Sequence, residues 1–167
     1  MSLKRIQGSL SCSDSVKIAI IISRFNRFIN DNLLNGAVDI LRRIGGLKKE
    51  NISVVEVPGA YEIPLVVKIL SESGKYQSII TIATIIKGET KHFEYICNSC
   101  NVEIPKISME YNIPISCGIL VAENIDQAIA RSGLKMGNKG SDAALVSLEM
   151  INLVKKISNI SRIGNHS

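Results

Sequence analysis

The sequence predicts an α/β protein in which a central four-stranded parallel sheet lies between two layers of helices, a three-layer α/β/α sandwich. Two observations lead to this prediction. Short runs rich in β-branched residues alternate four times with longer segments whose apolar residues recur at helical spacing, and the connections between them are short. Because repeated strand–helix units require parallel pairing and right-handed crossovers, we expect helices on both faces of the sheet.

Four segments have the length and composition of strands. Residues 16–22 form a β-branched run typical of a buried strand, and residues 78–86 are apolar on both faces, as expected of a central parallel strand. The predicted strands are residues 16–22, 52–57, 78–86 and 115–121.

Helical spacing of apolar residues predicts a helix after each strand and a further helix near the end of the chain. The first ends at Gly45 and Gly46, and the third contains Pro105, where a kink or break is expected. The predicted helices are residues 29–44, 65–74, 90–111, 124–131 and 141–157. Residues 132–140, which carry Lys135 and Lys139, are expected to form a loop. This order of elements is typical of a flavodoxin-like fold.

The chain has 167 residues, which fits a single domain over residues 1–167 with an N-terminal arm at 1–15 and a frayed tail at 158–167. Neither a signal peptide nor an apolar run of the roughly 18 residues that span a bilayer is recognisable, so we expect a cytoplasmic protein without membrane partners. A net charge of +5 suits phosphate-bearing ligands. Nucleic acid is disfavoured because the basic residues are scattered and aromatic residues make up only 4% of the chain.

Cys97 and Cys100 have the C-x-x-C spacing that redox pairs and zinc half-sites share. A zinc site needs further ligands, and the two histidines, His92 and His166, have no plausible partner nearby in sequence. A redox pair usually opens a helix, whereas this pair falls a turn or more inside the predicted one. Reduced, structural thiols are therefore favoured over a redox pair, and no metal is expected.

Ligands of such sheets bind beyond the carboxyl ends of the strands, which selects residues 23–28, 57–64, 86–92 and 122–124. In the first two segments, Phe25 and Tyr61 could stack on a flat ring, and Glu62 could accept hydrogen bonds from its polar edge. From these segments alone, ordinary turn chemistry and loop packing are the favoured explanation.

The third segment contains the turn KGET and then a histidine at the start of a predicted helix. Free backbone N–H groups and the helix dipole make such a turn a candidate anion site, although it matches neither the Walker loop nor GxGxxG. His92 could transfer protons near neutral pH. The alternatives are a plain strand–helix turn with Thr90 as N-cap and a surface histidine.

Five segments taken together resemble the lumazine synthase family, the 6,7-dimethyl-8-ribityllumazine synthases. They are RFN, PGAYEIP, IIKGETKHFEYICN, GILVAENIDQAIAR and GNKGSDAA, in this order and without a large insertion between residues 6 and 153. The resemblance implies condensation of 5-amino-6-(D-ribitylamino)uracil with 3,4-dihydroxy-2-butanone 4-phosphate in riboflavin biosynthesis. Phosphate and water are released, and no metal or redox cofactor is used.

The resemblance also implies roles for individual residues. His92 matches the proton-transfer residue. The positions that match contacts to the pyrimidine and ribityl groups are Phe25, Ala60, Tyr61, Glu62, Thr84, Ile85, Ile86, Cys117 and Lys139. The positions that match the phosphate site are Glu89, Thr90 and Arg131. In the family, Arg131 and Lys139 are contributed by the neighbouring subunit.

Several positions depart from the family pattern. Cys117 stands after the fourth strand where the family often has phenylalanine, and Lys87 replaces a common arginine. Two alternatives therefore stay open: a non-catalytic lumazine- or flavin-binding or shell-forming homologue, and a flavodoxin-like electron carrier, which lacks the usual phosphate-loop composition. The family forms pentamers, some of which build icosahedral shells, and the short loop at 133–140 favours the shell. Riboflavin synthase is an additional candidate partner.

Overall fold

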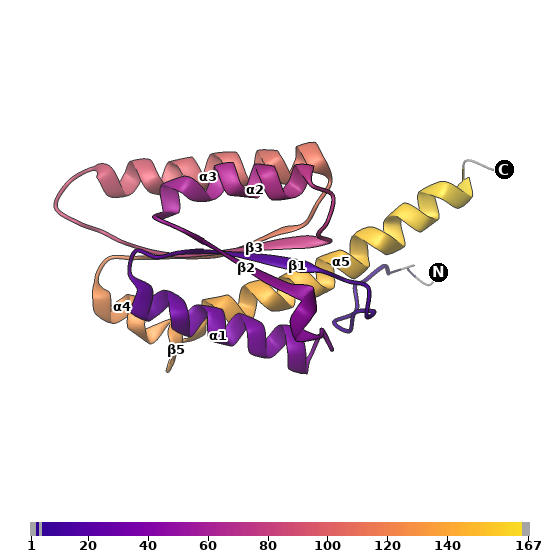
Figure 1. Ribbon diagram of the computed structural model, residues 1–167, viewed down its shortest axis with the longest axis horizontal. Helices are drawn as coiled ribbons and strands as arrows, with labels where there is room; N and C mark the ends of the chain where they lie inside the picture. The colour runs from indigo at the N-terminus through magenta and orange to yellow at the C-terminus, as the bar shows by residue number, and fades with distance from the viewer. Residues whose placement is uncertain (1–2, 4, 165–167) are drawn as a thin grey trace.

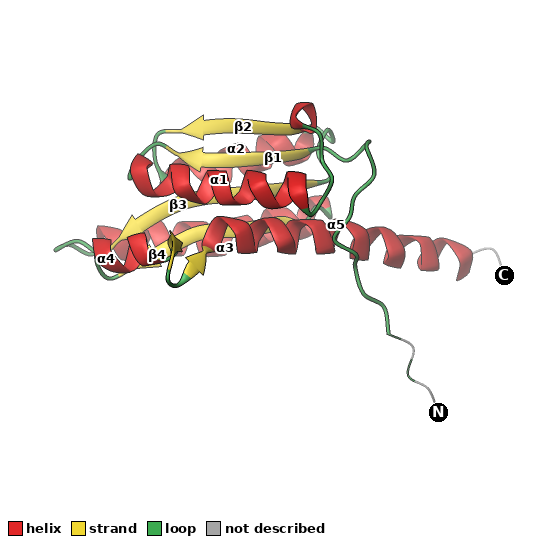
Figure 2. Cartoon of the chain, turned by 90° about the horizontal axis from the view of Figure 1, so that it is seen from below, coloured by secondary structure: helices red, strands yellow, loops and turns green. Residues whose placement is uncertain are grey.

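A computed structural model describes residue 3 and residues 5–164 of the chain, with a four-stranded sheet at its centre. The strands are β1 (Ile18–Ser23), β2 (Ile52–Val57), β3 (Ser78–Ile86) and β4 (Ile115–Ala122), in the order β2-β1-β3-β4. All three pairings are parallel, and the arrows of β1, β2 and β3 point the same way in Figure 2. The carboxyl ends of the strands therefore share one edge of the sheet.

Helices cover both faces of this sheet (Figure 1). One face is covered by α1 (Arg27–Arg43), α4 (Ile125–Ala130) and α5 (Lys139–Gly164), and the other by α2 (Ile63–Glu72) and α3 (His92–Tyr111). Two short 3₁₀ turns, η1 (Lys49–Asn51) and η2 (Ala60–Glu62), precede β2 and α2. The predicted three-layer sandwich around a four-stranded parallel sheet is confirmed.

The two central strands explain why the sequence is so rich in isoleucine. Every residue of β1 is buried, because successive side chains of a strand point to opposite faces and both faces are covered. Ile18 and Ile20 join the apolar cluster beneath α1 and α5, whereas Ala19 and Ile21 join the cluster beneath α2 and α3. Burial of each large aliphatic side chain stabilises the fold by about 1.5–3 kcal/mol.

Helix α3 differs from the prediction at two points. It begins at His92 with Lys91 at the N-cap position, so Thr90 is not the N-cap. It also continues through Pro105 without a break. Proline at 105 removes the hydrogen bond to the carbonyl of Asn101, and both residues face solvent, where water can satisfy that carbonyl.

The end of the chain also differs from the prediction. The predicted loop at 132–140 forms a hairpin of β5 (Ser132–Leu134) and β6 (Gly137–Asn138), with positive φ at Gly133 and Gly137. Helix α5 then begins at Lys139 and continues to Gly164, past the predicted end near residue 157. The last part of the predicted tail, residues 165–167, lies outside the described residues.

Residues 5–15, in the predicted N-terminal arm, run beside α5 without regular secondary structure. The side-chain amide of Asn152 donates to the carbonyls of Ser9 and Ser11 at 2.8 and 3.1 Å. Lys156 Nζ donates to the carbonyl of Gln7 at 2.8 Å. These bonds hold the arm against the helix.

The first turn of α5 packs directly against α1. A Cβ atom added to Gly140 would overlap the backbone carbonyl of Leu33. We expect Gly140→Ala to lower the free energy of unfolding by about 1–3 kcal/mol, because neither backbone can move without disturbing its helix. Thermal unfolding measures the effect. Gly88→Ala is the matched control, since a Cβ there meets nothing within 4 Å, and equal melting temperatures for the two variants would contradict the prediction.

Candidate functional site

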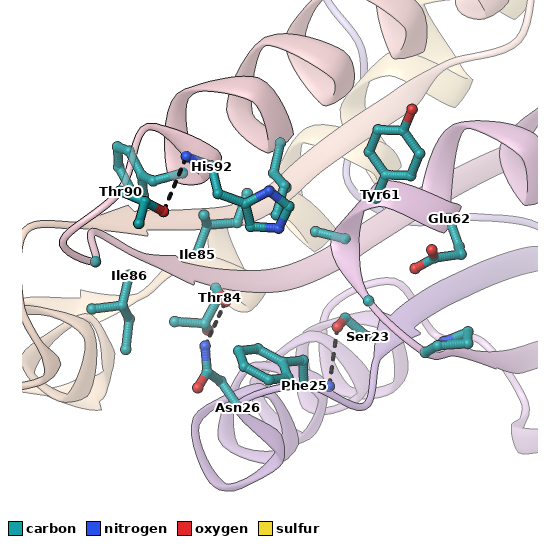
Figure 3. Close-up of a pocket in the computed structure, with 16 residues that line it drawn as sticks. Ser23, Phe25, Asn26, Tyr61, Glu62, Thr84, Ile85, Ile86, Thr90 and His92 are labelled. Carbon is teal, nitrogen blue, oxygen red and sulfur yellow. Dashed lines mark hydrogen bonds between the residues drawn. The ribbon is translucent and has the colours of Figure 1, made fainter.

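A pocket of about 520 Å³ lies at the carboxyl edge of the sheet, between the ends of β1, β2 and β3 and the start of α3 (Figure 3). In the sheet, β2 lies on one side of β1 and β3 lies on the other. The pocket therefore lies at the topological switch point, where ligands bind in such folds. Its lining residues are Ser23, Phe25, Asn26, Pro58, Gly59, Ala60, Tyr61, Glu62, Thr84, Ile85, Ile86, Gly88, Thr90, His92, Phe93 and Ile96.

Phe25 is the aromatic side chain of the β1–α1 turn and is 71% exposed at the pocket. The next residue, Asn26, adopts a left-handed conformation with φ of 61°, which asparagine tolerates better than most residues. The side-chain amide of Asn26 donates to the carbonyl of Thr84 at 2.8 Å. The turn that carries the ring is thus attached to the end of β3.

The β2–α2 connection supplies a second side of the pocket through Ala60, Tyr61 and Glu62 of η2. Figure 3 shows the Glu62 carboxylate and the Phe25 ring directed toward the same opening, while the Tyr61 ring points away from Phe25. A Cβ at Gly59 would come within 3.0 Å of Glu62 Oε2, so glycine leaves room for the carboxylate. A carboxylate beside an aromatic ring suits a flat ligand with polar N–H or O–H groups.

The end of β3 forms the floor of the pocket. Thr84 and Ile85 are almost fully buried, and Ile86 is half-buried where the strand ends. These three positions were predicted from the resemblance, and the structure places all of them at the pocket. The floor is largely apolar, which favours desolvation of a ring that lies on it.

The β3–α3 loop and the first turn of α3 bring Gly88, Thr90 and His92 to the pocket. The backbone N–H of His92 donates to Thr90 Oγ1 at 3.4 Å, and the imidazole projects toward the opening in Figure 3. The first N–H groups of a helix have no intrahelical acceptors, and the helix dipole favours anions there. A histidine side chain and a candidate anion-binding turn therefore lie side by side at the pocket.

Some of the residues predicted for the site do not line this pocket. Glu89 is exposed in the loop between Gly88 and Thr90 but is not among the lining residues, and the predicted segment 122–124 is also absent from them. Cys117 is the third residue of β4, paired with Thr81, and does not follow the strand as the resemblance implied. Because β4 continues to Ala122, Cys117 is far from the carboxyl edge and lines a separate groove beside Cys100 and Met109.

Arg131 and Lys139 lie outside the pocket but next to each other. They flank the β5–β6 hairpin, and the backbone N–H of Lys139 donates to the carbonyl of Arg131 at 3.1 Å. Both side chains are exposed. The pocket lining contains neither lysine nor arginine. A phosphate in this pocket would have no arginine or lysine partner among those lining residues.

Sequence reasoning did not single out Asn26, Phe93 or Ile96 as site residues. Ile96 could have been found, since it follows His92 by one helical turn and so lies on the same face of α3. Asn26 was part of a recognised segment, but its side-chain bond to Thr84 joins positions far apart in the sequence.

The thiol of Cys100 is buried beneath the pocket wall and donates to the carbonyl of Ala60 at 3.3 Å. Burial raises the pKa of Cys100 to about 11, and it also raises the pKa of Cys97. All four cysteines are free thiols. Within residues 3 and 5–164, no group of three or more His, Cys, Asp or Glu side chains is arranged to hold a metal ion.

We expect Cys100 to resist alkylation by iodoacetamide in the native protein at pH 8. With a pKa of about 11, only about one thiol in a thousand is ionised at that pH, and the thiolate is the reactive form. Peptide mass spectrometry after a timed reaction measures the modification. The same protein unfolded in urea is the control, where Cys100 should react readily. Equal labelling in both states would contradict the burial of this thiol.

No helix among the described residues combines the length and apolar character needed to cross a membrane.

The fold and pocket define a flavodoxin-like α/β/α protein with a small-molecule site at its topological switch point. Residues 15–155 match the family described as 6,7-dimethyl-8-ribityllumazine synthase, and the chain belongs to this family.

Similar curated proteins carry the same description. The protein from Buchnera aphidicola subsp. Acyrthosiphon pisum (strain Tuc7), named 6,7-dimethyl-8-ribityllumazine synthase, is 55% identical over 93% of this chain and 96% of its own length. The protein of the same name from Buchnera aphidicola subsp. Baizongia pistaciae (strain Bp) is 53% identical over 91% of this chain and 96% of its own length. The protein of that name from Blochmanniella pennsylvanica (strain BPEN) is 53% identical over 89% of this chain and 94% of its own length.

Proposed function

We propose that the chain condenses 5-amino-6-(D-ribitylamino)uracil with 3,4-dihydroxy-2-butanone 4-phosphate to form 6,7-dimethyl-8-ribityllumazine in riboflavin biosynthesis. The observation that carries the proposal is the family match over residues 15–155, within which one pocket gathers an aromatic ring, a carboxylate, a histidine and a helix N-terminus. Each of these groups has a task in the condensation.

The pyrimidine lies in the apolar part of the pocket. Phe25 stacks on its ring, while Ile85 and Ile86 form the floor. Glu62 accepts hydrogen bonds from the N–H and O–H groups of the ring edge and the ribityl chain. Tyr61 lies at the rim, where the ribityl chain leaves the pocket.

The second substrate places its phosphate at the β3–α3 turn. Backbone N–H groups around Glu89 and Thr90 and the N-terminus of α3 receive the phosphate oxygens. Arg131 of a neighbouring subunit supplies the missing cation, and a guanidinium grips phosphate through two parallel hydrogen bonds. Lys139, held beside Arg131 by the hairpin, approaches the pyrimidine.

The reaction needs proton transfers more than strong activation. The 5-amino group attacks the ketone carbon and water leaves, which gives an imine. Loss of a proton and of phosphate gives an enol, which tautomerises to a carbonyl, and attack by the ribitylamino nitrogen with loss of a second water closes the ring. His92 accepts and returns protons during these steps, and the alignment of the two substrates supplies much of the acceleration.

The same proposal includes assembly into pentamers, with twelve pentamers in an icosahedral shell. Many large apolar side chains are exposed on the single chain, which is expected when further surface becomes buried between subunits. They include Phe28, Leu65, Tyr95, Met109, Leu134 and Met136. Light scattering and analytical ultracentrifugation would test it, and a monomer at micromolar concentration would contradict it. A cytoplasmic location and contact with riboflavin synthase belong to this proposal.

The activity is tested by mixing the two substrates with the protein and following the absorbance and fluorescence of the lumazine. We expect product well above the protein-free background. Tight binding of the lumazine without turnover would instead favour the non-catalytic alternative. If the protein neither forms product nor binds the lumazine, the proposal is refuted.

A further inference from the structure

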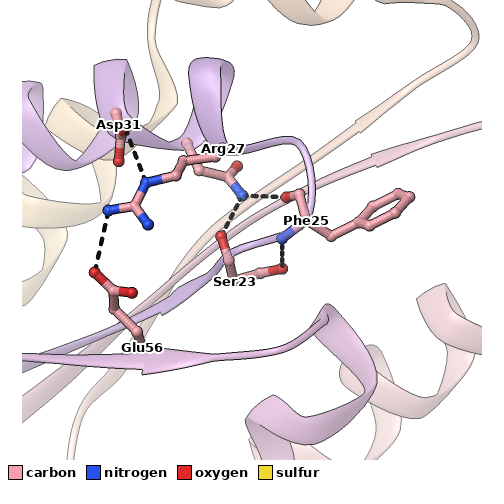
Figure 4. Close-up of polar contacts among 6 residues, drawn as sticks. Ser23, Phe25, Arg27, Asp31 and Glu56 are labelled. Atoms are coloured by element: carbon pink, nitrogen blue, oxygen red, sulfur yellow. Dashed lines mark hydrogen bonds and ion pairs between the residues drawn. The ribbon is translucent and has the colours of Figure 1, made fainter.

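Asn30 is a fully buried polar residue near the start of α1, with 0% of its surface exposed. Its side-chain Nδ2 donates to the carbonyls of Ser23 and Phe25, both at 2.8 Å. Figure 4 draws these two bonds as dashed lines that end on Ser23 and Phe25. Its Oδ1 accepts a hydrogen bond of 2.6 Å from Thr84 Oγ1. Both donors and the acceptor of the amide are therefore used.

These bonds close a network around the turn that carries Phe25. Phe25 donates its own backbone N–H to Ser23 Oγ at 3.2 Å, and Asn26 Nδ2 donates to the carbonyl of Thr84. Both polar backbone groups of Phe25 are thus held, and the turn is joined at two points to the end of β3. Only the aromatic ring projects freely into the pocket.

A buried amide is unfavourable unless all its hydrogen bonds are made, whereas an apolar side chain at the same helix position would have no such requirement. Asn30 lies in the row of buried α1 residues that includes Ile29 and Leu33. A fully satisfied buried network makes its surroundings rigid. The position of Asn30 thus indicates a task that an apolar residue could not perform, which is to fix the geometry of the turn.

The ion pairs on the outer side of the same turn cannot perform this task. Arg27 contacts Asp31 at 3.4 Å and Glu56 at 3.3 Å, as Figure 4 shows, but all three side chains are about half exposed. Exposed pairs of this kind contribute little and are weakened by salt. The buried bonds of Asn30 and Thr84 therefore set the position of Phe25.

We propose that Asn30, together with the hydroxyl of Thr84, is a positioning residue that holds the Phe25 ring ready to stack on the pyrimidine substrate. This inference rests on the proposed function for the identity of the ring. A stacking group fixed before binding loses less conformational entropy when the ligand arrives, so the effect falls on affinity for the flat substrate.

Thr84→Val is the principal test, because it keeps the branched shape and removes only the hydroxyl. We expect the KM for the pyrimidine to rise about tenfold, since a buried acceptor on Asn30 loses its partner. The KM for the phosphate-bearing substrate should stay within about twofold, because no bond of the network reaches the β3–α3 turn. Thr84→Ser restores the hydroxyl and should recover most of the pyrimidine affinity. Asn30→Asp, which replaces both donors by an acceptor, should exceed the effect of Thr84→Val.

Ser147→Ala is the matched control. Ser147 is equally buried, and its hydroxyl bonds Ser78 Oγ at 2.7 Å at the opposite end of the sheet. Its loss should lower stability and leave both KM values unchanged. Hydrogen exchange of the Phe25 amide, measured without substrate, should be faster in Thr84→Val than in the wild type and unchanged in Ser147→Ala.

Two results would overturn the inference: unaltered exchange of the Phe25 amide in Thr84→Val, or an equal rise of both KM values. A wild-type protein that makes no lumazine would refute the proposed function instead. In that case the exchange experiment still decides whether Asn30 and Thr84 fix the turn.

Discussion

Replacement of His92 by alanine is expected to lower kcat about a hundredfold, at the lower end of the range for loss of a general acid–base group. The imidazole lies in the first turn of α3 at the pocket, beside the loop that contains Thr90. Under the proposed function it transfers protons during the condensation and binds neither substrate. Both KM values should therefore stay within about twofold, as steady-state kinetics with each substrate varied in turn would show.

His92→Gln and Lys91→Ala complete the experiment. Glutamine keeps a hydrogen-bonding side chain but cannot carry a proton at neutral pH. The kcat of His92→Gln should therefore be as low as that of His92→Ala. Lys91 is the adjacent exposed residue and does not line the pocket, so its replacement should leave kcat unchanged. Wild-type rates for His92→Ala would make His92 an ordinary surface residue.

The fold was predictable because the strands of a doubly covered parallel sheet are continuous apolar runs. The segments predicted at 52–57 and 78–86 coincide with β2 and β3. The predictions of a break at Pro105 and of a loop at 132–140 were wrong, and both depended on solvent access or on backbone geometry. Pro105 is tolerated because it faces water, and the β5–β6 hairpin rests on positive φ angles at two glycines. Neither condition can be read from a hydrophobic pattern.

The site was predictable to the extent that the carboxyl ends of parallel strands meet at one edge. This rule selected Phe25, Glu62 and His92 from three separate segments, and all three line the pocket. Cys117 came from the resemblance and not from this rule, and it lies within β4, as the predicted strand at 115–121 already implied. The rule could not find Asn30, which reads as an ordinary polar helix residue and acquires its partner Thr84 only through the fold.

Arg131→Ala is expected to raise the KM for the phosphate-bearing substrate by about 10- to 100-fold, the loss of a charge-assisted hydrogen bond worth ~1.5–3 kcal/mol. The affinity for the pyrimidine should change much less. Arg131→Lys should recover part of the loss, because it keeps the charge but not the planar fork. Initial rates over a series of phosphate-substrate concentrations measure the effect, and an unchanged KM would refute the assignment.

A mixing experiment decides whether Arg131 acts on its own pocket or on that of a neighbour. The pocket of one chain holds His92 but is lined by neither arginine nor lysine, while Arg131 and Lys139 flank the β5–β6 hairpin and are joined by a backbone hydrogen bond. If the site is shared, assemblies refolded from equal amounts of His92→Ala and Arg131→Ala chains contain intact sites, because one chain supplies the histidine and its neighbour the arginine. Random pairing makes about a quarter of the sites intact, so activity should recover to about that fraction of the wild type. The assay uses a phosphate-substrate concentration far below the raised KM of Arg131→Ala, so that each parent assembly is nearly inactive. If each chain uses its own Arg131, every site in the mixture lacks one of the two groups and the mixture is no more active than its parents.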